Sequence, residues 1–213
     1  CTDSEILAKI GNTLDVNVLL TSNNIESGSE RISSVLNEII EKTWSVNLKK
    51  INLVDKSEIY KNTLIINVQG DQPFIDEKVI DKMISYFIKN NAINQVITPI
   101  YKLTREAIFN ENIVKLVLNQ YKQVLYFSRS PIPFIRGIDE QKWHEITNFW
   151  GHVGIYGYRA DVLNNWKKYQ RSNLENLEKL EQLRLIEFGI IFDTFLVEGD
   201  FLSVDTESQL LEA

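Results

Sequence analysis

Apolar positions along the chain follow two periods, one typical of strands and one typical of helices. The run from 64 to 68 is apolar and β-branched, which predicts a strand buried on both faces. It stops at Gly70, Asp71 and Pro73, residue types that do not continue a central strand. From 76 to 90, apolar residues recur at helical spacing, which predicts an amphipathic helix whose stripe belongs to the core.

The rest of the chain shows the same mixture of elements. The pattern predicts further helices at 4–11, 27–40 and 174–188, and strands at 16–20, 95–101, 113–118, 124–128, 151–159 and 190–197. The polar stretches 43–62 and 137–149 predict loops. With no internal repeat and no linker, residues 1–213 are interpreted as one α/β domain.

Two aspartates lie at predicted strand ends. In an open α/β sheet, ligands bind in the crevice outside the carboxyl ends of the strands. Asp71 would place an acceptor-only carboxylate there, which suits a hard cation such as Mg²⁺, or it closes a turn and does nothing more. Asp205 ends another short strand and can also cap a final helix. The residues alone leave these alternatives open.

Three arginines are candidates for binding an anion. Arg31 lies in the first turn of a helix opened by the capping pair Ser27 and Glu30, where a cation opposes the helix dipole. Arg129 precedes two prolines that stiffen the backbone, so its planar fork suits a carboxylate or phosphate. Arg159 closes a strand with glycines three residues apart, which also carries His152 and Tyr156. For each, an ordinary surface or structural role remains the alternative.

Composition limits the classes of partner. The 213 residues carry a formal net charge of −6, so nothing attracts the chain in general to nucleic acid or to an anionic membrane. The single cysteine, Cys1, excludes an internal disulfide and fits a cytoplasmic location. No apolar run approaches the ~20 residues of a membrane span. Because Cys1-Thr-Asp3 resembles the end of a strand, we expect the chain to lack its front.

The motifs, taken in order, resemble those of the 3-deoxy-manno-octulosonate cytidylyltransferase (CMP-Kdo synthetase) family. The similar segments are Cys1-Thr-Asp3, Ser27-Gly-Ser-Glu-Arg31, Asn67-Val-Gln-Gly-Asp-Gln-Pro73, Tyr126-Phe-Ser-Arg-Ser-Pro-Ile-Pro133, His152-Val-Gly-Ile-Tyr-Gly-Tyr-Arg159, Leu180-Glu-Gln-Leu-Arg184 and Val204-Asp-Thr206. Each is weak alone, but the ordered set spans essentially the whole chain. The segments around Arg129 and His152 favour the Kdo branch over the sialic-acid enzymes.

The resemblance implies a Rossmann-like three-layer nucleotidyltransferase with a mostly parallel sheet, acting as a cytoplasmic homodimer in lipopolysaccharide synthesis. The implied reaction joins CTP and Kdo to give CMP-Kdo and pyrophosphate. By this resemblance Asp71 and Asp205 are the catalytic residues and hold Mg²⁺. Gly28, Arg31 and Gln69 would bind the nucleotide, and the sugar acid would contact Arg129, His152, Tyr156, Glu181 and Gln182, with Arg129 on its carboxylate.

The chain departs from the family pattern at several positions. The family opens with a strand and a basic loop, Pro-Ala-Arg-x-x-Ser-x-Arg-x-x-x-Lys, that grips the triphosphate; no such segment occurs here. Asn24-Ile25 replace an Asp-His pair, and Gln72, Asn173 and Glu207 stand where glutamate, proline and proline are usual. Two alternatives therefore stay open: a non-catalytic relative that binds CMP-sugar or a partner subunit, and a cytidylyltransferase for another 2-keto sugar acid.

Overall fold

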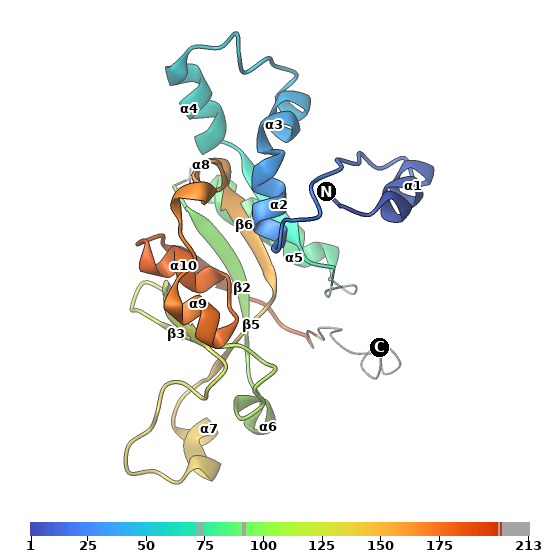
Figure 1. The fold of residues 1–213 in the computed structure, drawn as a ribbon. Helices are drawn as coiled ribbons and strands as arrows, with labels where there is room; N and C mark the ends of the chain where they lie inside the picture. The colour runs from blue at the N-terminus through green and yellow to red at the C-terminus, as the bar shows by residue number, and fades with distance from the viewer. Residues whose placement is uncertain (71, 73–74, 91–92, 200, 202–213) are drawn as a thin grey trace.

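In the part of the chain that the structure describes, a central sheet of seven strands carries helices on both of its faces (Figure 1). The computed structural model describes residues 1–70, 72, 75–90, 93–199 and 201. The strands are β1 (Leu64–Val68), β2 (Val96–Lys102), β3 (Lys115–Leu118), β4 (Val124–Ser128), β5 (Trp150–His152), β6 (Ile155–Arg159) and β7 (Phe192–Leu196).

The helices are mostly short. They are α1 (Glu5–Thr13), α2 (Gly28–Ser34), α3 (Leu36–Trp44), α4 (Leu53–Lys61), α5 (Glu77–Lys89), α6 (Arg105–Ile108), α7 (Trp143–Ile146), α8 (Ala160–Asn164), α9 (Asn173–Glu178) and α10 (Gln182–Glu187), with 3₁₀ turns at Glu140–Lys142 and Trp166–Lys168. No helix in the described part of the chain is long and apolar enough to cross a membrane.

The side chains of β2 show why the fold has three layers. Val96 and Ile100 belong to a core that includes helices α3, α8 and α10, whereas Ile97, between them, belongs to a core that includes helix α5. Successive side chains of a strand point to opposite faces of a sheet. The two cores therefore lie on opposite faces, and the predicted three-layer α/β architecture is confirmed.

The prediction that the sheet is mostly parallel is wrong. Among the strands that the structure describes, one pair, β2 and β7, is parallel. The antiparallel pairs are β1 and β6, β2 and β6, β2 and β5, β3 and β4, and β3 and β5. The segment β1–α5–β2 is a crossover between strands of the same direction, as the pattern indicated. Strand β6 inserts between those two strands in the opposite direction, however, and periodicity carries no information about where a strand inserts.

The predicted strand 151–159 is bent into two pieces with separate partners. Strand β7 pairs with β2 from Val96 to Ile100 and so occupies one edge of β2. Strand β6 pairs with the start of β2 and β5 with its end, so both lie along the other edge. The break at Val153 and Gly154 lets this strand change neighbours, from β3 beside β5 to β1 beside β6.

Several local predictions need correction. The stretch 43–62, predicted as a loop or a short excursion, is a loop only from 45 to 52. Asn52 then accepts a hydrogen bond from the Asp55 N–H (2.9 Å) and so caps helix α4. Residues 16–20 form no strand beyond a single bridge between Leu20 and Thr2. The stretch 137–149 contains α7 as well as a 3₁₀ turn. The helix predicted at 174–188 is two helices, because Lys179 adopts a left-handed conformation (φ 55°) between them.

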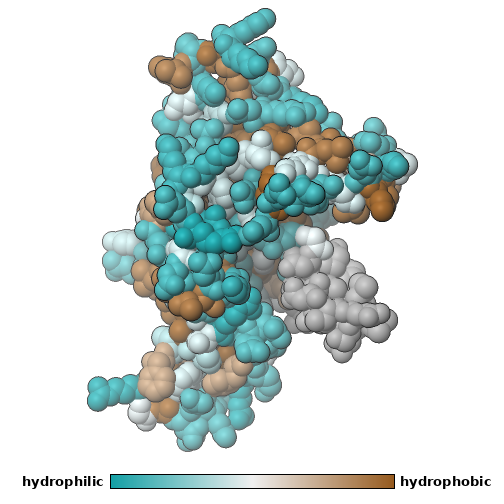
Figure 2. All heavy atoms as spheres, in the orientation of Figure 1, coloured by the Kyte–Doolittle hydropathy of each residue, from teal (hydrophilic) through white to brown (hydrophobic). Residues whose placement is uncertain are grey.

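On the face shown in Figure 2, polar residues cover most of the surface and apolar residues form separate patches. The capping prediction for Ser27 is confirmed, since its hydroxyl accepts a hydrogen bond from the Glu30 N–H at 3.2 Å. This cap begins α2 close to the sheet, where Ser29 Oγ contacts the Tyr158 hydroxyl at 3.1 Å and Asn67 donates to Ser29 at 3.3 Å.

Candidate active site

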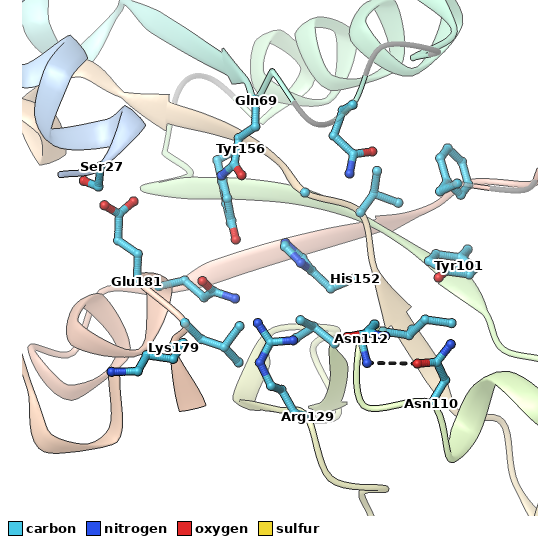
Figure 3. Close-up of a pocket in the computed structure, with 18 residues that line it drawn as sticks. Ser27, Gln69, Tyr101, Asn110, Asn112, Arg129, His152, Tyr156, Lys179 and Glu181 are labelled. Carbon is cyan, nitrogen blue, oxygen red and sulfur yellow. Dashed lines mark hydrogen bonds between the residues drawn. The ribbon is translucent and has the colours of Figure 1, made fainter. Parts of the chain in front are cut away.

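A polar cavity of about 570 Å³ opens where several elements end (Figure 3). Ser27, the cap of α2, lies on one side, and the turn between α9 and α10 lies beside it. The structure brings together six residues that the resemblance assigned to the substrates, and all six line this cavity: Gln69, Arg129, His152, Tyr156, Glu181 and Gln182. They are drawn from segments up to 113 positions apart (from 69 to 182), so the fold and not the sequence makes them neighbours.

The sheet positions three of these residues. Gln69 directly follows β1, His152 ends β5 and Tyr156 lies in β6, opposite Asn67 of β1. The imidazole of His152 lies between two rings, with its centroid 5.1 Å from that of Tyr156 and 5.2 Å from that of Phe127. Strand β1 pairs with β6, and β5 and β6 both pair with β2, so the backbone hydrogen bonds of one sheet fix the relative positions of these residues.

Arg129 is held by contacts at both its backbone and its side chain. The carboxylate of Glu178 accepts hydrogen bonds from the Ser128 hydroxyl (2.7 Å) and from the Arg129 N–H (2.9 Å). The guanidinium donates from Nε to the Glu178 carbonyl (2.8 Å) and from Nη1 to the Glu111 carbonyl (3.1 Å). Both acceptors of the guanidinium are neutral carbonyls, and no carboxylate among the described residues forms an ion pair with it. Its other N–H groups can therefore donate to a ligand.

The turn between α9 and α10 brings Glu181 and Gln182 to the cavity. Behind the turn, the buried Arg184 donates to Glu175 through Nε at 2.7 Å and also through Nη2, and the Arg184 guanidinium lies 5.3 Å from the centroid of the Trp166 ring. This bidentate pair joins the two helices across the left-handed residue Lys179. The pair therefore determines how the turn presents its side chains to the cavity.

Glu181 is a largely enclosed carboxyl group. Burial raises the pKa of Glu181, while hydrogen bonds from Ser27 and Ser29 and the charge of Arg184 act in the opposite direction. Its Oε2 atom has no hydrogen-bond partner in the described part of the chain. An enclosed oxygen without a partner suits a ligand that brings its own donor, such as a sugar hydroxyl.

His152 is held in its neutral form. Burial disfavours the charged imidazolium and lowers the pKa of His152 to about 3. Its Nε2 atom is enclosed and unpartnered among the described residues. A neutral ring nitrogen facing a cavity can take one hydrogen bond from or to a ligand.

This neutral state makes stability depend on pH. The unfolded chain binds a proton at His152 near pH 6.5 and the folded chain only near pH 3. The stabilisation of the folded state that comes from this difference is therefore complete above pH 6.5 and is lost progressively as the pH falls from 6.5 towards 3. We expect the urea midpoint of the wild type to fall from pH 6.5 to 4.5 more steeply than that of His152→Asn. The same substitution at the chain's other histidine, His144→Asn, is the comparison, and a slope for His152→Asn equal to that of the wild type would contradict the buried neutral ring.

Two residues assigned to the nucleotide lie outside the cavity lining. Arg31 donates to the Thr21 hydroxyl (2.5 Å), to the carbonyls of Ser22 and Ile25, and to the Asp3 carboxylate (3.2 Å), which joins the N-terminal segment to α2. Gly28 contacts the Asn67 side chain: a Cβ there would lie 3.5 Å from it. Their roles in binding nucleotide stay predictions. The third arginine, Arg159, forms a two-pronged ion pair with Asp161 (2.7 and 2.9 Å) away from the cavity.

Asp71 and Asp205 lie outside the described residues. Among the described residues, no three Asp, Glu, His or Cys side chains are grouped closely enough to hold a metal ion. Two observations nevertheless fit a hard cation. Asp71 is flanked in sequence by Gln69 and Gln72, which both line the cavity, and the two aspartates supply the oxygen donors that Mg²⁺ prefers.

Other cavity residues were not singled out from the sequence as ligand-binding. Ser27 was recognised only as a helix cap, and the helical pattern at 174–188 hid the break that exposes Lys179. The polar pair Asn110 and Asn112 precedes β3 without any periodic signal. The further lining residues are Gln72, Tyr101, Ile113, Val114, Val153, Gly154, Leu180 and Phe201.

A three-layer α/β domain with a polar cavity at the ends of its strands is typical of enzymes that act on small polar substrates, nucleotidyltransferases among them. The sequence profile of the family described as "Cytidylyltransferase" matches residues 1–192. This chain belongs to that cytidylyltransferase family of nucleotidyltransferases.

Relatives with curated names support this assignment. A 3-deoxy-manno-octulosonate cytidylyltransferase of Rickettsia prowazekii is 35% identical over 212 residues, covering 100% of this chain and 74% of the relative. The enzyme of the same name from Thermodesulfovibrio yellowstonii is 32% identical, covering 98% of this chain and 76% of the relative. The solved structure of a CMP:2-keto-3-deoxy-manno-octonic acid synthetase complexed with CTP superposes with a TM-score of 0.77 at 30% identity, covering 99% of this chain and 76% of that one.

Proposed function

We propose that this protein transfers CMP from CTP to the anomeric hydroxyl of Kdo, giving CMP-Kdo and pyrophosphate. The observation that carries the proposal is the cavity, in which residues from distant segments meet around a space of about 570 Å³. The names of the relatives and of the CTP-bound neighbour support the choice of CTP and Kdo.

The contacts of the cavity suggest a role for each side of it. The Arg129 guanidinium would bind the carboxylate of the sugar acid through two parallel hydrogen bonds. The backbone N–H and the Nε atom of Arg129 already donate to Glu178, which fixes the position of the guanidinium. The unpartnered atoms Glu181 Oε2 and His152 Nε2 would bind sugar hydroxyls, with Tyr156 and Gln182 beside them. Gln69, at the end of β1, would lie near both substrates.

In the reaction, the anomeric oxygen forms a bond to the α-phosphorus of CTP, the bond from that phosphorus to the bridging oxygen breaks, and pyrophosphate leaves while the hydroxyl proton is lost. The cavity contributes chiefly by holding the sugar hydroxyl in line with that bond. Asp71 and Asp205 would hold Mg²⁺, which when bound neutralises the phosphate charge. These two roles rest on the resemblance.

The wider setting is part of the proposal. We expect residues 1–213 to form one cytidylyltransferase domain, to act as a cytoplasmic homodimer, and to bind neither nucleic acid nor a membrane. The product would serve lipopolysaccharide synthesis. The chain corresponds to about three quarters of its relatives' length, so activity is best measured on this chain and on a version with upstream coding sequence included.

Pyrophosphate release from CTP, Mg²⁺ and a sugar acid tests the proposal. We expect release with Kdo and at least about a hundredfold lower kcat/KM with N-acetylneuraminate, because a cavity built to hydrogen-bond one set of hydroxyls discriminates strongly against another. Preference for N-acetylneuraminate would replace Kdo with another 2-keto sugar acid. Binding of CMP-Kdo without turnover in either version of the chain would instead favour a non-catalytic relative.

Arg129→Lys tests the carboxylate contact. Lysine keeps the charge and loses the planar fork, so we expect the KM for Kdo to rise about tenfold or more while the KM for CTP changes little. The control is Arg159→Lys, which removes a fork from the ion pair with Asp161 outside the cavity and should leave both KM values unchanged. Equal rises in the two KM values of the Arg129 variant would argue against a carboxylate contact.

A further inference from the structure

Lys115 is a buried cation that no carboxylate among the described residues contacts directly. The residue is 0% exposed and lies in β3, where it pairs with Ser128 of β4 and with Gly151 of β5. Its ammonium donates to three backbone carbonyls, those of Asn110 (2.8 Å), Ile113 (2.7 Å) and Arg129. An ammonium has three N–H donors, so these three carbonyls use all of them.

The three carbonyls belong to the wall of the cavity. Asn110 and Ile113 lie in the segment between α6 and β3, from which Asn110, Asn112, Ile113 and Val114 line the cavity. The same segment supplies the Glu111 carbonyl that accepts from Arg129 Nη1 at 3.1 Å and the Val114 carbonyl that accepts from the His152 N–H at 2.9 Å. Lys115 therefore joins this wall to the backbone of Arg129 at one point.

Burying a lysine in this way destabilises the fold, so we expect the side chain to have a role at this position. Moving an ammonium out of water is unfavourable, and contacts with carbonyl dipoles compensate for that loss of hydration only in part. A methionine or leucine would fill the same space in β3 without that cost. What an apolar side chain cannot do is bind three carbonyls from two segments at once.

We infer that Lys115 is a positioning residue for the sugar-acid site: its ammonium holds the 110–113 wall and the Arg129 backbone together, so that the Arg129 guanidinium faces the ligand carboxylate. The inference rests on the proposed function for its substrate. The connection that Lys115 makes between the 110–113 wall and the Arg129 backbone does not depend on the proposed function.

Lys115→Met is the direct test, with Leu116→Ala as the matched control. Leu116 is the next residue of β3, is 1% exposed and packs in the core, so its truncation destabilises the same strand without touching the three carbonyls. We expect Lys115→Met to raise the KM for Kdo about tenfold, with the KM for CTP and kcat within about twofold of wild type. Leu116→Ala should lower stability without this split. Equal KM values for Kdo in Lys115→Met and wild type would overturn the inference.

A second measurement does not need any substrate. In hydrogen exchange, peptides covering 109–114 and 128–130 should exchange faster in Lys115→Met than in Leu116→Ala, while peptides of β1 and β6 should match between the two variants. Unchanged protection of 109–114 would overturn the connection. If the wild type shows no turnover of Kdo, the proposed function fails, and hydrogen exchange still decides whether Lys115 holds the wall.

The pH dependence of the wild type adds a readout that requires no variant to fold. Burial and the nearby charge of Arg129 lower the pKa of Lys115 to about 8, against the opposite effect of Glu178 and Glu111. Among the described residues, those three are the charged groups that act on it, from the end of β4, from α9 and from the wall. A neutral amine has only two N–H groups and releases one carbonyl. The KM for Kdo should therefore rise between pH 7.5 and 9 while that for CTP stays level; a level Kdo profile would count against the inference.

Discussion

Arg184→Met should lower the free energy of unfolding by about 3–5 kcal/mol, because it leaves the buried carboxylate of Glu175 without its main partner. The two side chains are only 7% and 8% exposed, and the pair is bidentate. Arg171 approaches Glu175 at 3.5 Å but is 46% exposed, so it replaces little of the lost interaction. Urea denaturation followed by circular dichroism gives the value.

Two further variants separate the buried charge from the loss of packing. Arg171→Met removes the exposed partner alone and should cost less than about 1 kcal/mol. The double variant Glu175→Met/Arg184→Met should recover most of the stability, since replacing both members of a buried pair by apolar groups is often near neutral. A double variant as unstable as Arg184→Met would mean that the guanidinium acts through its contact with Trp166 instead.

Asp205→Asn should reduce turnover at least about a hundredfold, because a neutral amide is a much poorer ligand for a divalent cation and the phosphate charge then goes uncompensated. Asp205 lies outside the described residues, and the expectation rests on the resemblance. The measurement is kcat at rising Mg²⁺ concentration, with excess Mg²⁺ recovering part of the activity. The urea midpoint should stay at the wild-type value.

Asp81→Asn is the control for that change. Asp81 is exposed on α5, outside the cavity lining, and the substitution removes the same charge. Its kcat and its Mg²⁺ dependence should match the wild type. An Asp205 variant that is as active as this control would remove Asp205 from the metal site.

The sequence pattern predicted helices and strands well where apolar side chains recur at regular spacing. It predicted them poorly where the backbone conformation of one residue changes the direction of the chain. The stripe at 76–90 became helix α5, and the apolar run at 64–68 became β1 at the predicted residues. The prediction that this strand is buried on both faces is wrong, because β1 ends the strand order of the sheet and Val68 is 48% exposed. The helix predicted at 174–188 breaks at Lys179, a residue type that gives no sign of a left-handed conformation. The direction of β6 between β1 and β2 depends on tertiary packing, which the spacing of glycines does not encode.

The sequence singled out charged and aromatic residues that line the cavity, but not the backbone carbonyls and the buried lysine that hold them in place. Arg129 and His152 were noticed because prolines and glycines surround them, and the resemblance added the others. Lys115 lies within a run that the pattern assigned to a strand, and only the three carbonyls around it show that it does more than occupy a strand position. The carbonyls that hold such a side chain are not encoded by residue type, so no sequence pattern reports them.

The most direct test of the central claim follows the new bond itself. Kdo labelled with ¹³C at its anomeric carbon is mixed with CTP, Mg²⁺ and the protein, in this chain and in the version that includes upstream coding sequence, and is observed by ¹³C and ³¹P NMR. The account predicts a new anomeric resonance split by coupling to one phosphorus, appearing together with pyrophosphate. Pyrophosphate without that coupling, or an unchanged Kdo spectrum in both versions of the chain, would contradict it.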